Sequence, residues 1–353
     1  MSTEPLPPAA DGTPRVSVME STPAIRPTTN PYIVQLVEAL RARPGLEVHL
    51  FSFRRAILGR YDVFHVHWPE ALLTATSGPR RWRRRVLTLA MLLRLRITRT
   101  PLVRTWHNLE RPQGLGRVDG FLLDLADRWT TLRIALNPVS TFTDDKPSVV
   151  IPHGHYRDWY GRQRAEARVP GRVAYVGLIR RYKGVENLVT AFRALDRPSL
   201  TLRVSGRPST DDLARSLEDL AGDDPRIGFD FSFLDDAAFV RELTSATLVV
   251  LPYHHMHNSG VALAALSVDR PALVPDTAFN RLLAEEVGPG WLYFFTGELT
   301  TAALEEALAA VEASPPSGRP NLDRRDWPAA GADHEAAFRR ALALAGRVRG
   351  GTR

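Results

Sequence analysis

A basic loop bounded by two glycines is the segment whose residue types point most directly to chemistry. Gly177 ends a predicted strand, Gly184 precedes a predicted helix, and Arg180, Arg181 and Lys183 lie between them. Such a loop offers backbone N–H groups, a helix N-terminus and three cations to one phosphate group. It has neither the Walker spacing nor a Gly-x-Gly-x-x-Gly motif, so neither a P-loop nor a dinucleotide fingerprint is indicated. The ordinary alternative is a solvated basic turn.

The loop 252–260, with the sequence PYHHMHNSG, also follows a predicted strand and leads into a helix that begins near Val261. Asn258 or Ser259 can cap this helix, which directs the positive end of its dipole at the site. Histidines at three positions of the loop suggest a metal ion as an alternative: His254, His255 and His257. Three histidines of one loop seldom converge on one ion without more distant ligands, so we favour a contact with a phosphate or a sugar.

Polar residues also occupy the predicted strand ends of the first half. They are Glu20 after the first strand, His65, His67 and Glu70 at and after a later one, and His107 after the next. His65 and His67 share a face of their strand, and His65 is equally well explained as a core histidine. His107, just beyond its strand, is the stronger functional candidate. Either glutamate could act as a general base, with a surface salt bridge as the ordinary alternative.

These loops depend on elements that alternate along the chain. Short β-branched and apolar runs alternate with segments of helical periodicity, which is typical of parallel βαβ units. The main predicted strands are 15–19, 46–51, 62–66, 102–106, 132–136 and 149–151 in the first half, and 172–176, 200–204, 226–229, 247–251 and 272–274 in the second. The pattern predicts an α/β fold of two Rossmann-like, doubly wound domains, in which ligands bind outside the carboxyl ends of the strands.

The periodicity lapses between Pro152 and Pro170, which predicts a linker between the two domains. We therefore expect a disordered tail over residues 1–14, a first domain over 15–155 and a second domain over 171–325. A last helix, over 333–348, follows a Pro-rich stretch that is long enough to bring it back onto the first domain.

The composition is that of a folded protein of about two domains. The chain has 353 residues, of which 44% are hydrophobic and 24% are charged, and a typical domain has about 150 residues. It contains no cysteine, which excludes disulfides, thiolate catalysis and Cys-based zinc sites and favours a reducing cytoplasm. No apolar run reaches the length of a membrane span, and the first residues lack the apolar core of a signal peptide, so export is not expected.

A dense basic segment, GPRRWRRR at 78–85, continues into VLTLAMLL at 86–93 and is followed by Arg94, Arg96 and Arg99. As a helix it combines an apolar stripe with positive charge and Trp82, a combination that suits an anionic membrane surface. A helix that packs its apolar face on the sheet and exposes its arginines explains the segment equally well.

Several runs together resemble the C-terminal half of GT-B glycosyltransferases of the family 4 type: IPHG at 151–154, YVGLIRRYKGVENLVTAF at 175–192, LRVSG at 202–206, and the segment from IGF at 227 through LVVLPYHHMHNSGVALAALSVDRPALVP. The first half is similar more loosely, through DVFHVHWPE and TWHN. The HNSG variant resembles bacterial exopolysaccharide β-mannosyltransferases, which use GDP-mannose and invert the anomeric carbon. The resemblance implies a GT-B fold, with two Rossmann-like domains facing a cleft.

The resemblance also implies site residues. Lys183 and either Arg180 or Arg181 would bind the donor diphosphate, and His107 would face the transferred sugar. The donor site expected on this basis comprises Gly177, Arg180, Arg181, Lys183, His257, Asn258, Ser259 and Gly260. Met256 and Ala264 stand at the two positions where members of family 4 carry glutamate. This departure disfavours the retaining mechanism of that family.

We therefore expect a glycosyltransferase that moves a sugar from a nucleotide-sugar donor, GDP-mannose being favoured, to a saccharide or lipid-linked saccharide. Inversion needs a base, for which Glu20, Glu70 and His107 are the candidates, and stabilisation of the leaving diphosphate by the basic loop and the helix after Ser259. The sequence contains no Asp-x-Asp, so we expect no metal and no other cofactor.

Two alternatives remain at this level. A sugar-nucleotide epimerase shares the architecture. A non-enzymatic nucleic-acid-binding protein would fit the net charge of +7, but no recognised binding module is present, and we expect no nucleic acid as a partner. For the enzyme we expect a cytoplasmic location, with peripheral contact at the inner face of the plasma membrane.

Overall fold

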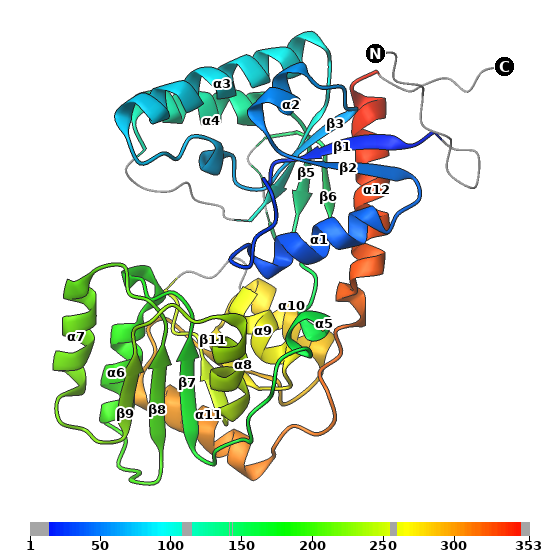
Figure 1. The fold of residues 1–353 in the computed structure, drawn as a ribbon. Coiled ribbons are helices and arrows are strands. Elements are labelled where there is room, and N and C mark those ends of the chain that lie inside the picture. Colours follow the sequence, from blue (N-terminus) through cyan, green and yellow to red (C-terminus); the bar gives the residue numbers. More distant parts are fainter. Residues whose placement is uncertain (1–13, 108–114, 141, 143, 255–259, 347–353) are drawn as a thin grey trace. The chain divides into compact units, whose positions relative to one another are not determined.

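A computed structural model describes residues 14–107, 115–140, 142, 144–254 and 260–346 of the chain. The chain forms two compact units, each built of parallel strands and helices (Figure 1). Unit 1 takes the chain up to Gly154 and again from Arg324, and unit 2 spans His155–Asp323. No helix within the described ranges is both long and apolar enough to span a bilayer. The expected tail over 1–14 lies, apart from Pro14, outside the described residues.

Unit 1 is built on a six-stranded sheet with the order β2-β1-β3-β4-β5-β6, and all of its strand pairs are parallel. The strands are β1 (Val16–Glu20), β2 (Leu46–Leu50), β3 (Val63–Val66), β4 (Leu102–Trp106), β5 (Thr130–Ala135) and β6 (Ser148–Val150). The inner strands β1, β3, β4 and β5 are largely buried, which accounts for their apolar composition and is usual for parallel sheets, whereas the edge strands β2 and β6 are more exposed.

The helices of unit 1 cover the two faces of this sheet. One face carries α1 (Pro31–Arg41) and α12 (Trp327–Leu344), which pack on each other. Right-handed crossovers place α2 (Phe53–Leu58), α3 (Gly78–Ile97) and α4 (Arg117–Trp129) on the other face. The core beneath them includes Met19 and Phe64 of the sheet and Met91, Leu92 and Leu95 of α3. The inner face of α3 is therefore an ordinary packing surface.

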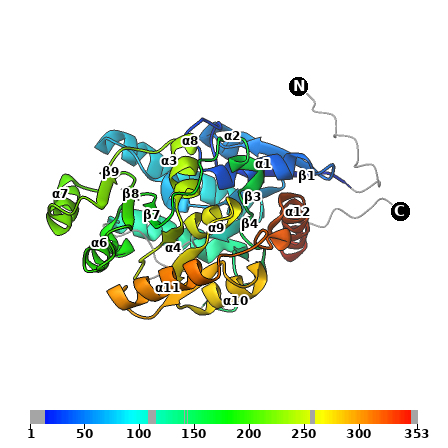
Figure 2. The same ribbon diagram turned by 90° about the horizontal axis from the view of Figure 1, so that it is seen from below.

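Unit 2 repeats this architecture with the strand order β12-β11-β10-β7-β8-β9, again parallel throughout. Its strands are β7 (Arg172–Val176), β8 (Thr201–Ser205), β9 (Ile227–Asp230), β10 (Leu248–Val250), β11 (Ala272–Pro275) and β12 (Leu292–Phe295). Its helices are α5 (Arg157–Tyr160), α6 (Val185–Arg193), α7 (Asp211–Ala221), α8 (Asp236–Ser245), α9 (Gly260–Ser267), α10 (Ala278–Val287) and α11 (Thr301–Ala313). Figures 1 and 2 show α6 and α7 side by side. The predicted α/β class with two Rossmann-like sheets is confirmed.

Local sequence explains where the helices begin. Asn30 accepts a hydrogen bond from Tyr32 N at 2.9 Å and caps α1, and Thr210 caps α7 in the same way through Leu213 N. The helix α12 begins at Trp327, earlier than the predicted 333, because Pro328 suits a first turn. The sequence analysis did not assign α8, α10, β12 or α11. The last of these is rich in alanine, which favours a helix but gives little contrast between its faces.

Each sheet reverses its strand order once. In unit 1 the reversal lies between β1 and β3, and in unit 2 it lies between β7 and β10. At such a point the connections that leave the carboxyl ends of two adjacent strands run to opposite faces of the sheet. They leave a crevice between them, in which doubly wound folds bind ligands. The polar strand ends singled out in the sequence follow these four strands and β4, so the sheet order brings them together within each unit.

Candidate active site

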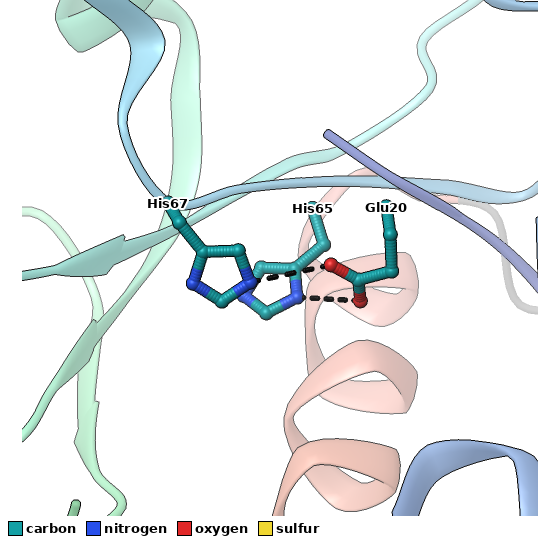
Figure 3. A group of neighbouring side chains, drawn as sticks. All are labelled: Glu20, His65 and His67. Atoms are coloured by element: carbon teal, nitrogen blue, oxygen red, sulfur yellow. Dashed lines mark hydrogen bonds and ion pairs between the residues drawn. The ribbon is translucent and has the colours of Figure 1, made fainter. Parts of the chain in front are cut away.

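In unit 1 the carboxyl ends of β1 and β3 bring one carboxylate against two imidazoles. Glu20 ends β1, and His65 and His67 come from β3 and the residue just after it. Figure 3 shows both rings directed at the Glu20 carboxylate. His65 Nδ1 lies 2.8 Å from Glu20 Oε1, and His67 Nε2 lies 3.2 Å from Glu20 Oε2. All three side chains are at most 1% exposed, so the surface salt bridge considered for Glu20 is wrong.

The charge state of this group follows from its contacts. Burial by itself raises the pKa of Glu20, but the charge of His65 and hydrogen bonds from His65 and His67 outweigh it and hold the pKa well below its usual range. Burial and the neighbouring His65 lower the pKa of His67 to about 4. At neutral pH the glutamate is therefore ionised and His67 is neutral. An ionised carboxylate only accepts hydrogen bonds, so both histidines donate to it.

His107 continues this group toward the surface. It follows β4, it is half-buried, and its Nε2 lies 3.1 Å from His67 Nδ1. Its ring stacks on Trp68, with centroids 4.1 Å apart, and meets Tyr32 edge-on at 5.1 Å. Burial and the adjacent His67 lower the pKa of His107 well below its ordinary value. At neutral pH His107 is therefore neutral, the form in which an imidazole can accept a proton, and its lowered pKa makes it a weaker base than a free histidine.

Two further histidines belong to the cluster, and the sequence analysis did not assign either of them to the site. His153 packs its ring 4.5 Å from Tyr32, and burial lowers its pKa to about 4. His334 comes from α12, with its ring 5.6 Å from that of His65, and burial lowers its pKa to about 3. His153 lies in the IPHG run and could have been found there. His334 carries no sequence signal, because only packing of the last helix brings it to β3.

Glu70 lies apart from these contacts. It is in the short 3-10 helix Pro69–Leu72, half-buried, and its side chain makes no hydrogen bond or ion pair with another described residue. The structure therefore brings together Glu20 and His107 of the three base candidates, with His65 and His67 between and beside them.

In unit 2 the loops after β7 and β10 lie together at the strand reversal. Gly177 and Gly184 have positive φ values of 130° and 62°, a region that favours glycine. A side chain at Gly184 would place its Cβ 2.2 Å from Pro252 O, so the first loop passes directly against the second. His254 N also donates to Tyr182 O at 3.3 Å, which ties the two loops together.

Three cations of the first loop differ in their surroundings. Arg180 is half-buried and its guanidinium donates to Ile179 O at 2.7 Å and to Arg207 O at 3.2 Å. Lys183 has its ammonium 5.1 Å from the centre of the Tyr253 ring, and burial, together with the charge of Arg180, lowers its pKa to about 8. No carboxylate of the described ranges pairs with Lys183. Arg181 is exposed and lies 3.3 Å from Glu186.

The other expected donor residues are placed only in part. Gly260 begins α9, and Ala264 is buried within that helix. His257, Asn258 and Ser259 lie outside the described residues, as do His255 and Met256. His254 is exposed, with its Nδ1 4.0 Å from Glu298.

Glu20, His65 and His67 are also residue types that can hold a metal ion. One ligand atom each from Glu20, His65 and His67 lies within 4.8 Å of the other two. Every nitrogen of the two histidines already has a hydrogen-bonding partner, since His65 Nε2 lies 2.8 Å from Thr105 Oγ1. These contacts account for the buried group through hydrogen bonds alone.

The chain is similar to known proteins over nearly its whole length. No protein-family model matches it. A GDP-mannose:glycolipid 4-beta-D-mannosyltransferase of Xanthomonas campestris pv. campestris is 40% identical over 337 residues, which cover 94% of this chain and 95% of the relative. A second enzyme with the same name, from the same pathovar, is 39% identical over the same shares of the two chains.

Solved structures share the fold at low identity. HepE of Anabaena, in complex with UDP and glucose, aligns with a TM-score of 0.61 at 14% identity, covering 95% of this chain and 98% of that one. Sucrose-phosphate synthase of Thermosynechococcus elongatus aligns with a TM-score of 0.56 at 16% identity, covering 94% and 97%. Fold and relatives together define this chain as a GT-B glycosyltransferase. It belongs to the same family as the two β-mannosyltransferases of Xanthomonas.

Proposed function

We propose that this glycosyltransferase moves mannose from GDP-mannose to a lipid-linked saccharide and forms a β-linkage. The observation that carries the proposal is the 40% identity, over 94% of the chain, to a GDP-mannose:glycolipid β-mannosyltransferase. The buried Ala264 stands at a position where members of family 4 carry glutamate. This supports inversion, because an alanine cannot stabilise a developing oxocarbenium charge.

In the proposed reaction the two units have separate roles. The acceptor hydroxyl oxygen attacks the anomeric carbon as the bond from that carbon to the diphosphate oxygen breaks, and the hydroxyl proton passes to His107. His107 is the preferred base because it is half-buried, whereas Glu20 is fully enclosed. Arg180 and Lys183 of unit 2 stabilise the charge of the departing GDP. Gly177 and Gly260 let backbone N–H groups approach the diphosphate, and the proposed donor site also takes in His257, Asn258 and Ser259.

We propose that no metal takes part, because the cations of the basic loop and the N-terminus of α9 meet the charge of the diphosphate. Turnover should then survive EDTA with less than a twofold change. Loss of activity on chelation that manganese or magnesium restores would contradict this and return His254, His255 and His257 to consideration as ligands.

We also propose that α3 holds the enzyme at the cytoplasmic face of an anionic membrane, where a glycolipid acceptor would be found. Its outer face carries an exposed apolar stripe of Trp82, Val86, Leu89, Leu93 and Ile97 at intervals of one helical turn. The most exposed of these, Ile97, is 79% exposed. Arginines flank the stripe, which is the pattern of a helix that lies in a membrane interface. No nucleic acid partner is proposed.

The decisive experiment is product analysis. Purified enzyme is given GDP-mannose and a lipid-linked oligosaccharide, and the anomeric configuration of the product is read by proton NMR. The proposal requires a new β-linked mannose and release of one GDP per linkage. An α-linked product would refute inversion, and conversion of the nucleotide sugar without any acceptor would favour the epimerase.

A further inference from the structure

The segment that follows β3 carries two side chains that the reaction proposed above does not use, those of Trp68 and Glu70. We propose that these two residues bind the acceptor saccharide. The indole of Trp68 packs on the apolar face of one pyranose, and the Glu70 carboxylate accepts hydrogen bonds from its hydroxyls. The proposal rests on the proposed function, in which the acceptor reacts beside His107. It gives Glu70 a part in recognition, in place of the role of base that the sequence suggested.

Trp68 follows β3, one of the two strands at the reversal of unit 1, and lies directly beside His107. The two rings stack with their centroids 4.1 Å apart and their planes inclined by 22°. The indole is half-buried, and its N–H makes no hydrogen bond with another described residue. A sugar that packs on the exposed part of Trp68 therefore has its hydroxyls close to the imidazole proposed as the base.

Glu70 comes two residues after Trp68, in the 3-10 helix Pro69–Leu72. Two residues span at most about 7 Å of chain, so one sugar residue can reach both side chains. Glu70 is also half-buried, and its carboxylate pairs with no other described residue. A carboxylate accepts hydrogen bonds at both of its oxygens, which suits a ligand that offers neighbouring O–H donors.

These three groups together fit a pyranose sugar. The aromatic face takes C–H groups, the indole N–H donates to an oxygen, and the carboxylate accepts from hydroxyls. A pyranose has an apolar face of C–H groups and an edge of hydroxyls, so it can satisfy all three. A phosphate offers no apolar face and would be repelled by the charge of Glu70. The subsite therefore recognises the saccharide of the acceptor and not a phosphate group.

Packing holds the backbone that carries the two side chains. Pro69 and Leu72 are buried, and Leu72 belongs to the core that the sheet shares with α3. Arg84 of α3 also donates a hydrogen bond to Ala71 O at 3.2 Å. The segment is thus fixed before any ligand arrives, and a preformed subsite loses little conformational freedom when it binds a sugar.

The first test observes the subsite without turnover. The indole ¹H–¹⁵N resonance of Trp68 is identified by its loss in Trp68→Phe. The wild-type protein is then titrated with the oligosaccharide of the product assay after its lipid has been removed. We expect the resonance to shift and saturate, with an apparent Kd about tenfold higher or more in Glu70→Gln. A resonance that does not move with a saccharide that the enzyme glycosylates would overturn the proposal.

The same titration separates the subsite from the proposed function. Should no transfer of mannose be detected, a panel of methyl pyranosides at millimolar concentration replaces the oligosaccharide. A shift of the Trp68 resonance would then support the subsite while the proposed function fails. No shift with any of these sugars would overturn the subsite as well.

The second test separates recognition from acid–base catalysis. Glu70→Gln should raise the KM for the acceptor by about 10- to 100-fold, the range for hydrogen bonds to a charged group, with kcat and the Kd for GDP within threefold of wild type. Glu38→Gln changes an exposed glutamate of the same unit and is the matched control. A kcat lowered by about 10²-fold or more at an unchanged KM would make Glu70 a base and overturn the proposal. Constants equal to those of Glu38→Gln would overturn it too.

The third test asks whether Trp68 binds the saccharide or only supports His107. Trp68→Phe keeps an aromatic face, whereas Trp68→Ala removes it. Recognition predicts that the KM for the acceptor rises about 30-fold or more in Trp68→Ala and at most about fivefold in Trp68→Phe. A lower kcat with an unchanged KM in Trp68→Ala would indicate support alone and overturn the proposal. Circular dichroism and GDP binding show whether each variant is folded, and the titration of the wild-type protein decides if Trp68→Ala is not.

Discussion

Lys183 is the residue at which burial and function conflict most clearly. Lys183 is half-buried beside Arg180 and pairs with no carboxylate among the described residues, and burial and that neighbouring charge lower its pKa to about 8. A diphosphate would supply the missing negative charge and raise the pKa again. The cost of keeping this lysine charged in the free protein therefore favours binding of an anion.

Donor affinity should fall above pH 8, because free Lys183 loses its proton there and must regain it to bind the diphosphate. Calorimetric titration with GDP from pH 7.5 to 9.5 measures this, and proton uptake near pH 8 should accompany binding. Lys183→Arg, which stays charged throughout, is the control and should give a smaller dependence on pH. An identical pH dependence in the two proteins would contradict the role of Lys183.

The basic loop allows a direct test of which cations bind the donor. Lys183→Ala and Arg180→Ala should each weaken GDP binding by about 1.5 to 3 kcal/mol, the range for hydrogen bonds to charged groups. Arg181→Ala removes the same charge from the same loop, but Arg181 is exposed and faces Glu186, so we expect a loss below about 0.5 kcal/mol. Unchanged affinity in the first two variants would remove the loop from the donor site.

At the scale of single elements, α3 has two apolar faces, one buried and one exposed. Thr88, Met91, Leu92 and Leu95 are buried against the core of unit 1. The opposite stripe, from Trp82 to Ile97, is exposed. The packing alternative considered for this segment describes the inner face, and the exposed stripe is the feature on which the proposed membrane contact rests.

Contact of α3 with a membrane is tested by sedimentation with vesicles of phosphatidylglycerol and phosphatidylcholine. Arg83 and Arg96 flank the exposed stripe, and each well-placed cation contributes about 1 kcal/mol at an anionic surface. The double variant Arg83→Ala, Arg96→Ala should thus bind about 10- to 30-fold more weakly. Val86→Ser with Leu93→Ser should also reduce binding. The control is Phe233→Ser in unit 2, an equally isolated aromatic that is 62% exposed; equal effects of control and test would reject the α3 surface.

At the scale of the whole molecule, unit 1 encloses titratable groups that must stay neutral. Burial lowers the pKa of His67 and of His153 to about 4 and that of His334 to about 3. Between pH 6.5 and these values the unfolded chain binds protons that the folded chain does not, so stability is lost as the pH falls. Glu20 affects stability in a lower pH range. Its lowered pKa stabilises the folded chain at pH values above 4.5, and this stabilisation is lost only when the pH falls below 4.5.

The melting temperature should therefore fall when the pH is lowered from 7.5 to 5. At pH 5 a histidine with the pKa of His334 costs on the order of 2 kcal/mol, or about 4 to 8 °C for a unit of this size. His334→Phe should raise the melting temperature at pH 5 relative to wild type by more than it does at pH 7.5. His254→Gln, an exposed histidine of unit 2, is the control. An equal shift of His334→Phe at both pH values would contradict the buried, neutral state.

The sequence by itself determined the positions of most strands and the residue types at their ends. Gly177, Gly184 and the cations between them, or His107 after its strand, could be found because strand and helix periodicity is local and loops follow directly from it. The absence of cysteine and the HNSG run likewise needed no structure. The elements α8, α10, β12 and α11 were not assigned, because burial in a sheet or against its helices decides them more than local contrast does.

Only the tertiary structure decided which strand ends meet. The order of strands places β1 beside β3 and β7 beside β10, and no local pattern encodes that order. Packing of the sheet buries Glu20 completely, whereas the sequence allowed either a base or a surface ion pair at this position. Packing of the last helix brings His334 next to His65, although the two residues are separated by more than half the chain. Burial then lowers the pKa values of His67, His153 and His334, and contacts with the histidines hold that of Glu20 low. These pKa values depend on which groups share a low-dielectric interior, and that is a property of long-range packing.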